Sequence, residues 1–195
     1  MILIYHLRTA ILTPPKTGST ALLEGLCRPP YDGVFCIGPI GEPGHFDHHS
    51  SVVPSMASDW RKIAIVRHPL ERLVSLWGHH VRHTLWGRKP ITSLNAFALD
   101  VAARRHRFYC MNWNLNEVLG DVDCQFARTE TLGEDLVHFG ILRTPGELPR
   151  TNYFEAGGIP RPDWRTELTP RSITALEAWW RPDCVRFGYP FPSKG

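Results

Sequence analysis

Short runs of apolar and β-branched residues mark the strands that the sequence predicts. Residues 9–13 form one such run, which ends at Pro14. Residues 62–66 (KIAIV) give the clearest buried strand, and two weaker strands are expected at 33–37 and 124–127. Runs of this length with turn-forming residues beside them are typical of strands buried inside a sheet.

Apolar residues at helical spacing predict helices between and after these strands. One helix is expected to start near Ser19 and to end before Pro29. A second begins at Pro69, where the missing N–H of proline costs nothing, and its apolar side is Leu70, Leu73, Val74, Trp77 and Val81. Further helices are predicted over about 93–106, over 132–139, and from Thr169 as cap through Trp180.

The alternation of strands and helices predicts an α/β fold. Such a pattern implies a three-layer sandwich, in which a central parallel sheet of about four to five strands is covered by helices on both faces. The length of 195 residues fits a single domain spanning 1–195. Two segments rich in Gly and Pro, 38–55 and 143–168, read as loops, and long loops in compact domains are often functional.

Composition excludes several function classes. The net charge of +3 is too small to favour wrapping of nucleic acid. The five cysteines have no C-x-x-C spacing, so neither a disulfide framework nor a cysteine zinc site is expected, and scattered thiols suit a reducing cytosol. No signal peptide and no apolar run of about 20 residues is recognised, which predicts a cytoplasmic protein without a membrane partner.

The first candidate motif follows the strand at 9–13. Its sequence is Pro15-Lys16-Thr17-Gly18-Ser19-Thr20, directly before the first predicted helix. The free N–H groups of a first helical turn, hydroxyl side chains and one ammonium together suit an anion. It is not the nucleoside-triphosphate motif, because its lysine precedes the glycine. The alternative is an ordinary strand–turn–helix with a capping hydroxyl.

The second candidate motif follows the strand at 62–66. Arg67 lies at the end of that strand, and Ser75 falls two helical turns later, on a polar arc with Glu71, Arg72, His79 and Arg82. An arginine fork with a hydroxyl suits a phosphomonoester. The alternative, a solvated helix face, is equally open for Arg72 and Arg82.

Together these motifs resemble the sulfotransferases that use 3′-phosphoadenosine 5′-phosphosulfate (PAPS). The resemblance continues in Phe126-Ala127-Arg128-Thr129-Glu130-Thr131-Leu132 with Glu134-Asp135-Leu136, and in Asp183 with Arg186-Phe187-Gly188-Tyr189. It is greatest for the carbohydrate-type and bacterial members. It implies a P-loop-like nucleotide-binding fold and transfer of a sulfuryl group from PAPS to a hydroxyl of a carbohydrate or small metabolite. Without a membrane anchor, a bacterial or viral origin is expected.

The resemblance also implies roles for single residues. Lys16, Thr17, Gly18, Ser19 and Thr20 would hold the 5′-phosphosulfate, with Lys16 as a catalytic residue, and Arg67 and Ser75 would hold the 3′-phosphate. A histidine in the loop before the Arg67 strand would be the base, either His49 or His45. No metal is required by this scheme.

Several alternatives stay open on the sequence alone. A P-loop-type phosphotransferase would need Mg²⁺, and a nucleotide- or glycan-binding module would need no base. A metal site could form from the histidine-rich loop and the following helix, drawing on His45, Asp47, His48, His49, His79, His80 and His83. Trp77, Trp179 and Trp180 are expected in the core, whereas Trp113 and Trp164 could stack on a ligand. Arg150-Thr151-Asn152 could close over the nucleotide.

Overall fold

The computed structural model describes residues 1–26, 34–36, 53–82, 93–104, 113–149 and 160–192, which belong to two compact units. The first unit comprises Met1–Arg67 and Val118–Thr151, and the second comprises His68–Glu117 and Asn152–Gly195. The chain therefore leaves the first unit directly after Arg67 and returns to it at Val118. A single domain over the whole chain stays a prediction.

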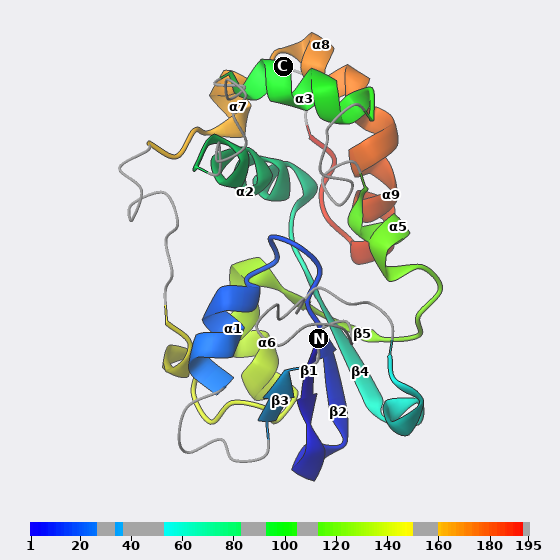
Figure 1. Cartoon of the computed structure of the whole chain (residues 1–195). Helices are drawn as coiled ribbons and strands as arrows, with labels where there is room; N and C mark the ends of the chain where they lie inside the picture. Colours follow the sequence, from blue (N-terminus) through cyan, green and yellow to red (C-terminus); the bar gives the residue numbers. More distant parts are fainter. Residues whose placement is uncertain (27–33, 37–52, 83–92, 105–112, 150–159, 193–195) are drawn as a thin grey trace. The chain divides into compact units, whose positions relative to one another are not determined.

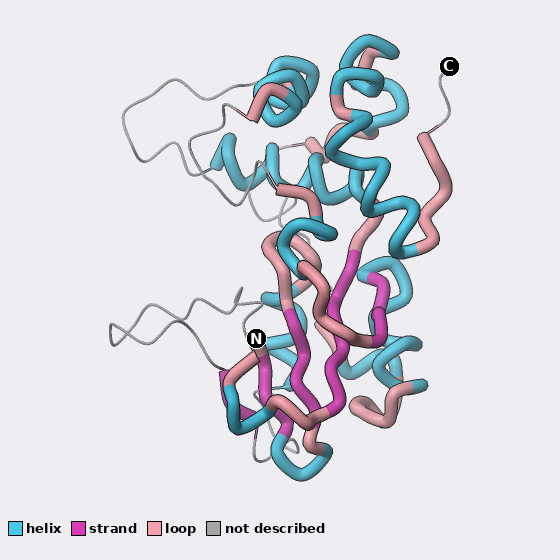
Figure 2. The backbone as a smooth tube through the Cα atoms, turned by 90° about the vertical axis from the view of Figure 1, so that its right-hand side faces the viewer, coloured by secondary structure: helices cyan, strands magenta, loops and turns pink. Residues whose placement is uncertain are grey.

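The described part of the first unit contains one five-stranded sheet (Figure 2). Its strand order is β3-β1-β2-β4-β5. The strands are β1 (Ile2–Ile4), β2 (Thr9–Leu12), β3 (Val34–Cys36), β4 (Arg61–Val66) and β5 (Gln125–Arg128). With the helices described below they confirm the predicted α/β class.

The sheet is mixed, so the prediction of a parallel sheet is wrong. β2 pairs with β4 and β4 with β5 in parallel, but β1 is antiparallel to both β2 and β3. The cause is the chain at 5–8, a 3₁₀ turn (Tyr5–Leu7) with Arg8 in the left-handed conformation. A parallel connection needs about a dozen residues or more, so this short link can only make an antiparallel pair.

Two helices pack on one face of the sheet: α1 (Ser19–Leu26) and α6 (Leu132–His138) (Figure 1). The shared core consists of Ile2, Ile4, Ile11, Leu22, Leu26, Ile63, Ile65, Ala127, Leu132, Leu136, Ile141 and Leu142. Alternate residues of β1 and of β4 point to this face, as the period of two in a strand requires. α6 also lies against the 3₁₀ turn Pro145–Glu147, where a Cβ at Gly133 would stand 2.6 Å from the Pro145 carbonyl oxygen.

The described part of the second unit is helical. Its helices are α2 (Pro69–Arg82), α3 (Leu94–Ala102), the start of α5 (Leu115–Leu119), α7 (Trp164–Glu167), α8 (Pro170–Ala175) and α9 (Glu177–Phe187). The predicted cap is confirmed, since the Thr169 hydroxyl accepts from the Ser172 N–H. The helix predicted through Trp180 is divided at Leu176.

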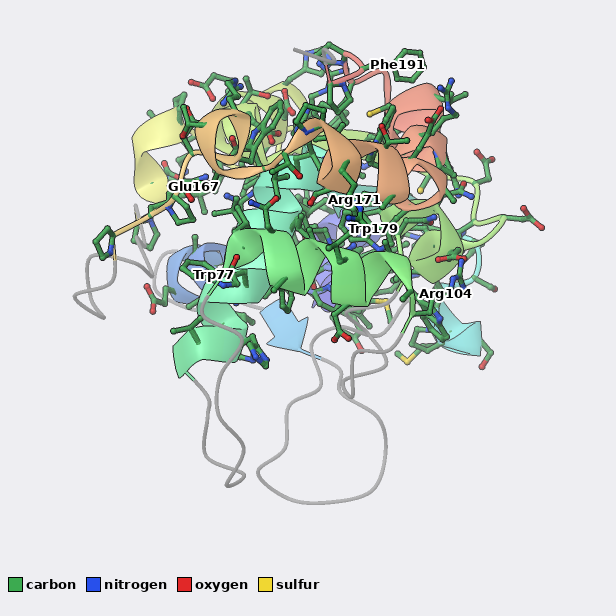
Figure 3. All side chains as sticks on the ribbon, turned by 90° about the horizontal axis from the view of Figure 1, so that it is seen from above. Trp77, Arg104, Glu167, Arg171, Trp179 and Phe191 are labelled. Carbon is green, nitrogen blue, oxygen red and sulfur yellow. The ribbon has the colours of Figure 1, made fainter. Side chains whose placement is uncertain are left out.

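The second unit buries aromatic rings together with two charges. Trp179 and Trp180 are 4% and 2% exposed, as predicted, and Figure 3 shows Trp179 among the helices and Phe191 at their edge. Arg72 and Asp183 are both fully buried. The solvated face that the sequence left open for Arg72 is therefore wrong, because this side chain lies inside the unit.

Backbone groups form hydrogen bonds with both buried charges. Arg72 Nη1 donates to the Trp113 carbonyl at 2.8 Å. The Asp183 carboxylate accepts from the N–H groups of Leu115 at 2.9 Å and Asn116 at 2.7 Å, and so caps α5. Burial raises the pKa of Asp183 to about 6, against the lowering effects of the Leu115 N–H and the Arg72 charge.

None of the helices among the described residues combines the length and the apolar character that a membrane crossing needs.

Candidate functional site

The carboxyl ends of the three parallel strands lie at one edge of the first unit's sheet. Leu12 at the end of β2 pairs with Ala64 of β4, and Val66 at the end of β4 pairs with Arg128 at the end of β5. The three segments that follow these strands therefore start side by side. Ligands of α/β sheets bind at this edge.

The loop after β2, Thr13–Gly18, has a backbone that suits an anion. Lys16 has φ +67° and Gly18 has φ +94°, whereas Thr17 between them does not have a positive φ. Concave anion sites made of successive N–H groups are built where left-handed and right-handed residues alternate. A non-glycine residue in the left-handed region costs on the order of 1 kcal/mol, and such residues cluster at functional sites.

The loop leads directly into α1. Ser19 is the first residue of this helix and is buried, while Thr20 is half-buried. The Leu22 N–H donates to the Gly18 carbonyl at 3.2 Å, so the N–H groups of the first turn follow directly on the loop. The helix dipole adds a positive potential at this end.

Three contacts hold the loop in this conformation. The Thr17 hydroxyl donates to the Pro14 carbonyl at 2.8 Å, so its proton is directed into the loop. Arg67 Nη1 donates to the Lys16 carbonyl at 3.3 Å. Thr129 Oγ1 lies 2.9 Å from the Thr17 carbonyl oxygen and 3.0 Å from the Val66 carbonyl oxygen. The structure thus brings Lys16, Thr17, Gly18 and Arg67 together within the first unit.

The role of Thr129 was not recognised in the sequence. The residue is part of the resemblance through its motif, but nothing in its own type distinguishes it. The signal is its position directly after β5, because the first residues after parallel strands meet at the same edge. Arg128 beside it is exposed at that edge.

The other predicted site residues lie elsewhere in the chain. Ser75 is half-buried on α2 of the second unit, and its role stays a prediction. His45 and His49 fall outside the described residues, as do Asp47, His48, His83 and 150–152. The identity of the base therefore stays open.

Two histidines of the proposed alternative metal site are described. His79 and His80 are half-buried on α2, and burial lowers the pKa of His80, against a smaller raising effect of Asp100. In the part of the chain that the structure describes, no group of three or more His, Cys, Asp or Glu could hold a metal ion.

Trp164 is part of the fold rather than a surface for stacking on a ligand. It is buried, its ring stacks on His68 with centroids 5.5 Å apart, and the Arg165 guanidinium lies over it. Its Nε1 donates to Glu71 Oε1 at 3.0 Å, and the other Glu71 oxygen is paired with Arg161. Glu71 thereby ties α7 to the first turn of α2.

Comparison of the chain with family models, with curated proteins and with solved structures finds no match.

Proposed function

We propose that this protein is a PAPS-dependent sulfotransferase. The acceptor is a hydroxyl of a carbohydrate or small metabolite, and the site is centred on the loop after β2. The observation that carries the proposal is the loop itself, in which Lys16 and Gly18 have positive φ directly before a helix. Anion-binding backbone loops are built from residues of this kind. The resemblance of the two motifs to sulfotransferases selects the phosphosulfate among anions.

In this proposal the loop and α1 bind the 5′-phosphosulfate. The N–H groups of Lys16, Thr17 and Gly18 hold non-bridging oxygens, and the hydroxyls of Ser19 and Thr20 add to them. Arg67 is already beside the loop through its bond to the Lys16 carbonyl and has further donors for a phosphate. Ser75 is the second partner of the 3′-phosphate.

The reaction is an in-line displacement at sulfur. The acceptor oxygen forms a bond to sulfur while the bond from sulfur to the bridging phosphate oxygen breaks, which releases adenosine 3′,5′-bisphosphate. Lys16 neutralises the charge that develops on that bridging oxygen. The acceptor proton passes to a histidine, His49 or His45, since imidazole titrates near neutral pH. Positioning and charge neutralisation supply most of the rate, as in phosphoryl transfer.

The finer architecture belongs to the same proposal. The order of elements supports a P-loop-like arrangement: β2 is followed by the proposed anion-binding loop and α1, and β4 and β5 run parallel to β2. A three-layer sandwich would require a second helical layer on the sheet face opposite α1 and α6. We also propose a cytoplasmic location, which suits the free thiols of Cys124 and Cys184.

A thermal-shift series with three nucleotides tests the function. Adenosine 3′,5′-bisphosphate should stabilise the full-length protein by about 2.7 kcal/mol at 100 times its dissociation constant. AMP should stabilise it less because it lacks the 3′-phosphate. A stronger response to ATP–Mg²⁺ than to the bisphosphate would contradict the proposal and favour a phosphotransferase.

Transfer of labelled sulfate from PAPS to a panel of sugars and small alcohols separates an enzyme from a binding module. His49→Ala and His45→Ala, measured side by side, then identify the base. A protein that binds the bisphosphate, yet transfers nothing to any acceptor and is unaffected by both substitutions, would be a nucleotide-binding module.

A further inference from the structure

We propose that Thr129 is the positioning residue of the anion-binding loop. Its hydroxyl connects the loop after β2 to the end of β4 and so fixes the backbone conformation in which Lys16 and Gly18 have positive φ. The inference rests on the proposed function for the identity of the ligand, but the fixing of the loop is a property of the unliganded chain.

The geometry makes Thr129 a bridge between the loop after β2 and the end of β4. Its Oγ1 lies within 3.0 Å of two carbonyl oxygens, those of Thr17 in the loop and Val66 in β4. A hydroxyl has one proton, so the two oxygens share it in a three-centre hydrogen bond. The Thr17 carbonyl lies between the two left-handed residues, so a contact there holds both of them.

The methyl group of Thr129 supports the same loop from the side. A Cβ added at Gly18 would stand 3.6 Å from Thr129 Cγ2, so the methyl group packs close beside the glycine. Thr129 thus acts on the loop through one polar and one apolar atom, and Ser or Val at this position would retain one of the two.

The turn that carries Thr129 is itself fixed. The Asp135 carboxylate accepts from the Arg128 N–H at 2.6 Å and from the Thr131 hydroxyl at 3.1 Å. The residues on both sides of Thr129 are therefore anchored to α6. Thr129 has a rigid base from which to hold a loop of strained conformation.

The alternative positioning group is Arg67, which donates to the Lys16 carbonyl. An arginine can leave that carbonyl to bind a phosphate, because its guanidinium has five donors on a long side chain. Thr129 has a short side chain and half-buried surroundings, so its contacts persist when a ligand arrives.

The experiment compares Thr129→Val, Thr129→Ser and the control Thr144→Val in the full-length protein. Val keeps the shape of Thr and removes the hydroxyl, Ser keeps the hydroxyl, and Thr144 is exposed in the same unit. Amide hydrogen exchange over residues 13–20 reports loop order without ligand, and titration with adenosine 3′,5′-bisphosphate reports affinity. Denaturant unfolding shows that each variant is folded.

Thr129→Val leaves two carbonyl oxygens without their donor, so exchange in the loop should rise about tenfold and affinity should fall about tenfold. Ser should stay within about threefold of wild type in both measurements, since it keeps the hydrogen bond. Unchanged loop exchange in Thr129→Val would overturn the inference, as would a loss in Ser as large as that in Val. If the wild type does not bind the bisphosphate but the exchange pattern holds, the proposed function fails while the role of Thr129 in the loop stands.

Discussion

The two units place their polar groups in opposite ways. In the first, Arg67 and Thr129 lie where strands end, and they donate to backbone carbonyls of a loop that keeps a strained conformation. In the second, Arg72 and Asp183 lie inside the helical core, and their bonds hold helices in place. Polar groups thus hold a loop at the end of the sheet in one unit and lie within the helical core in the other.

The net charge of each unit does not match the places of these polar groups. The segments of the first unit carry nine Lys and Arg against eleven Asp and Glu, whereas those of the second carry thirteen against eight. The candidate anion site therefore lies in the more acidic unit. For the proposed anion site, local backbone geometry and one or two cations matter more than the net charge of the unit, because exposed charges beyond about 10 Å are screened by salt.

The largest effect on stability is expected from Arg72→Met in the second unit. The Arg72 charge favours the ionised form of the buried Asp183. Its removal leaves that carboxylate uncompensated and should lower the free energy of unfolding by about 3–5 kcal/mol at pH 7. Urea unfolding measures it, with the exposed Arg171→Met as control. The loss should be smaller at pH 5, where Asp183 holds a proton. Equal, small losses in both variants would show that Arg72 is not a core residue.

Lys16→Ala in the first unit should have the opposite effect: a large loss of sulfuryl transfer with little change in the free energy of unfolding. Loss of charge stabilisation at the leaving oxygen should lower sulfuryl transfer by about 100- to 1,000-fold, which corresponds to about 2.7–4 kcal/mol. Unfolding should change little, because Ala adopts a positive φ about as unfavourably as Lys. Lys62→Ala, a lysine of β4 in the same unit, should keep transfer near wild type. Normal transfer in Lys16→Ala would remove the loop from the mechanism.

The pH dependence of the free energy of unfolding distinguishes the buried carboxylate of the second unit from the exposed carboxylates of the first. The folded pKa of Asp183 is about 6, above its ordinary value of 3.8, so the folded state binds the proton more tightly. Stability from this group is present below about pH 4 and is lost as the pH rises to 6, by up to about 3 kcal/mol. Asp183→Asn should remove this slope. Asp121→Asn, at an exposed site of the first unit, should keep it. An unchanged slope in Asp183→Asn would contradict the burial of its charge.

Arg67→Ala tests whether Arg67 binds the 3′-phosphate or only holds the loop after β2. Without its guanidinium the protein should bind adenosine 3′,5′-bisphosphate at least tenfold more weakly, since hydrogen bonds to charged groups contribute about 1.5–3 kcal/mol. Affinity for AMP should fall less, so the preference for the 3′-phosphate should disappear. Calorimetric titration of both ligands measures this. An equal loss of affinity for the bisphosphate and for AMP would show that Arg67 acts on the loop and does not bind the 3′-phosphate.

The smallest effect is expected at Gly133, where packing rather than charge is at stake. Gly133→Ala should lower the free energy of unfolding by about 1–3 kcal/mol, because the new Cβ meets the backbone of Pro145. Gly146→Ala, with open space around it, is the matched control. Similar unfolding midpoints for the two variants would show that α6 can move away from the 3₁₀ turn.

The local pattern of apolar residues predicted most strands and helices correctly but did not predict how the strands pair. The strand predicted at 62–66 is β4, and the helix predicted from Pro69 is α2, since both signals are local. β1 is not predicted, because an apolar run of three residues, Ile2–Ile4, is too short to indicate a strand by its pattern. The antiparallel pair that β1 makes with β2 then changed the sheet from parallel to mixed.

The sequence by itself determined the α/β class, the main elements and the loop Lys16–Gly18 before α1, since apolar periodicity, proline and glycine act over a few residues. Only the tertiary structure decided that Arg67 and Thr129 meet that loop and that Arg72 and Asp183 are buried. These contacts join residues 41–112 positions apart. They depend on which strands pair and which helix faces are covered, and neither is encoded in the local spacing of residue types.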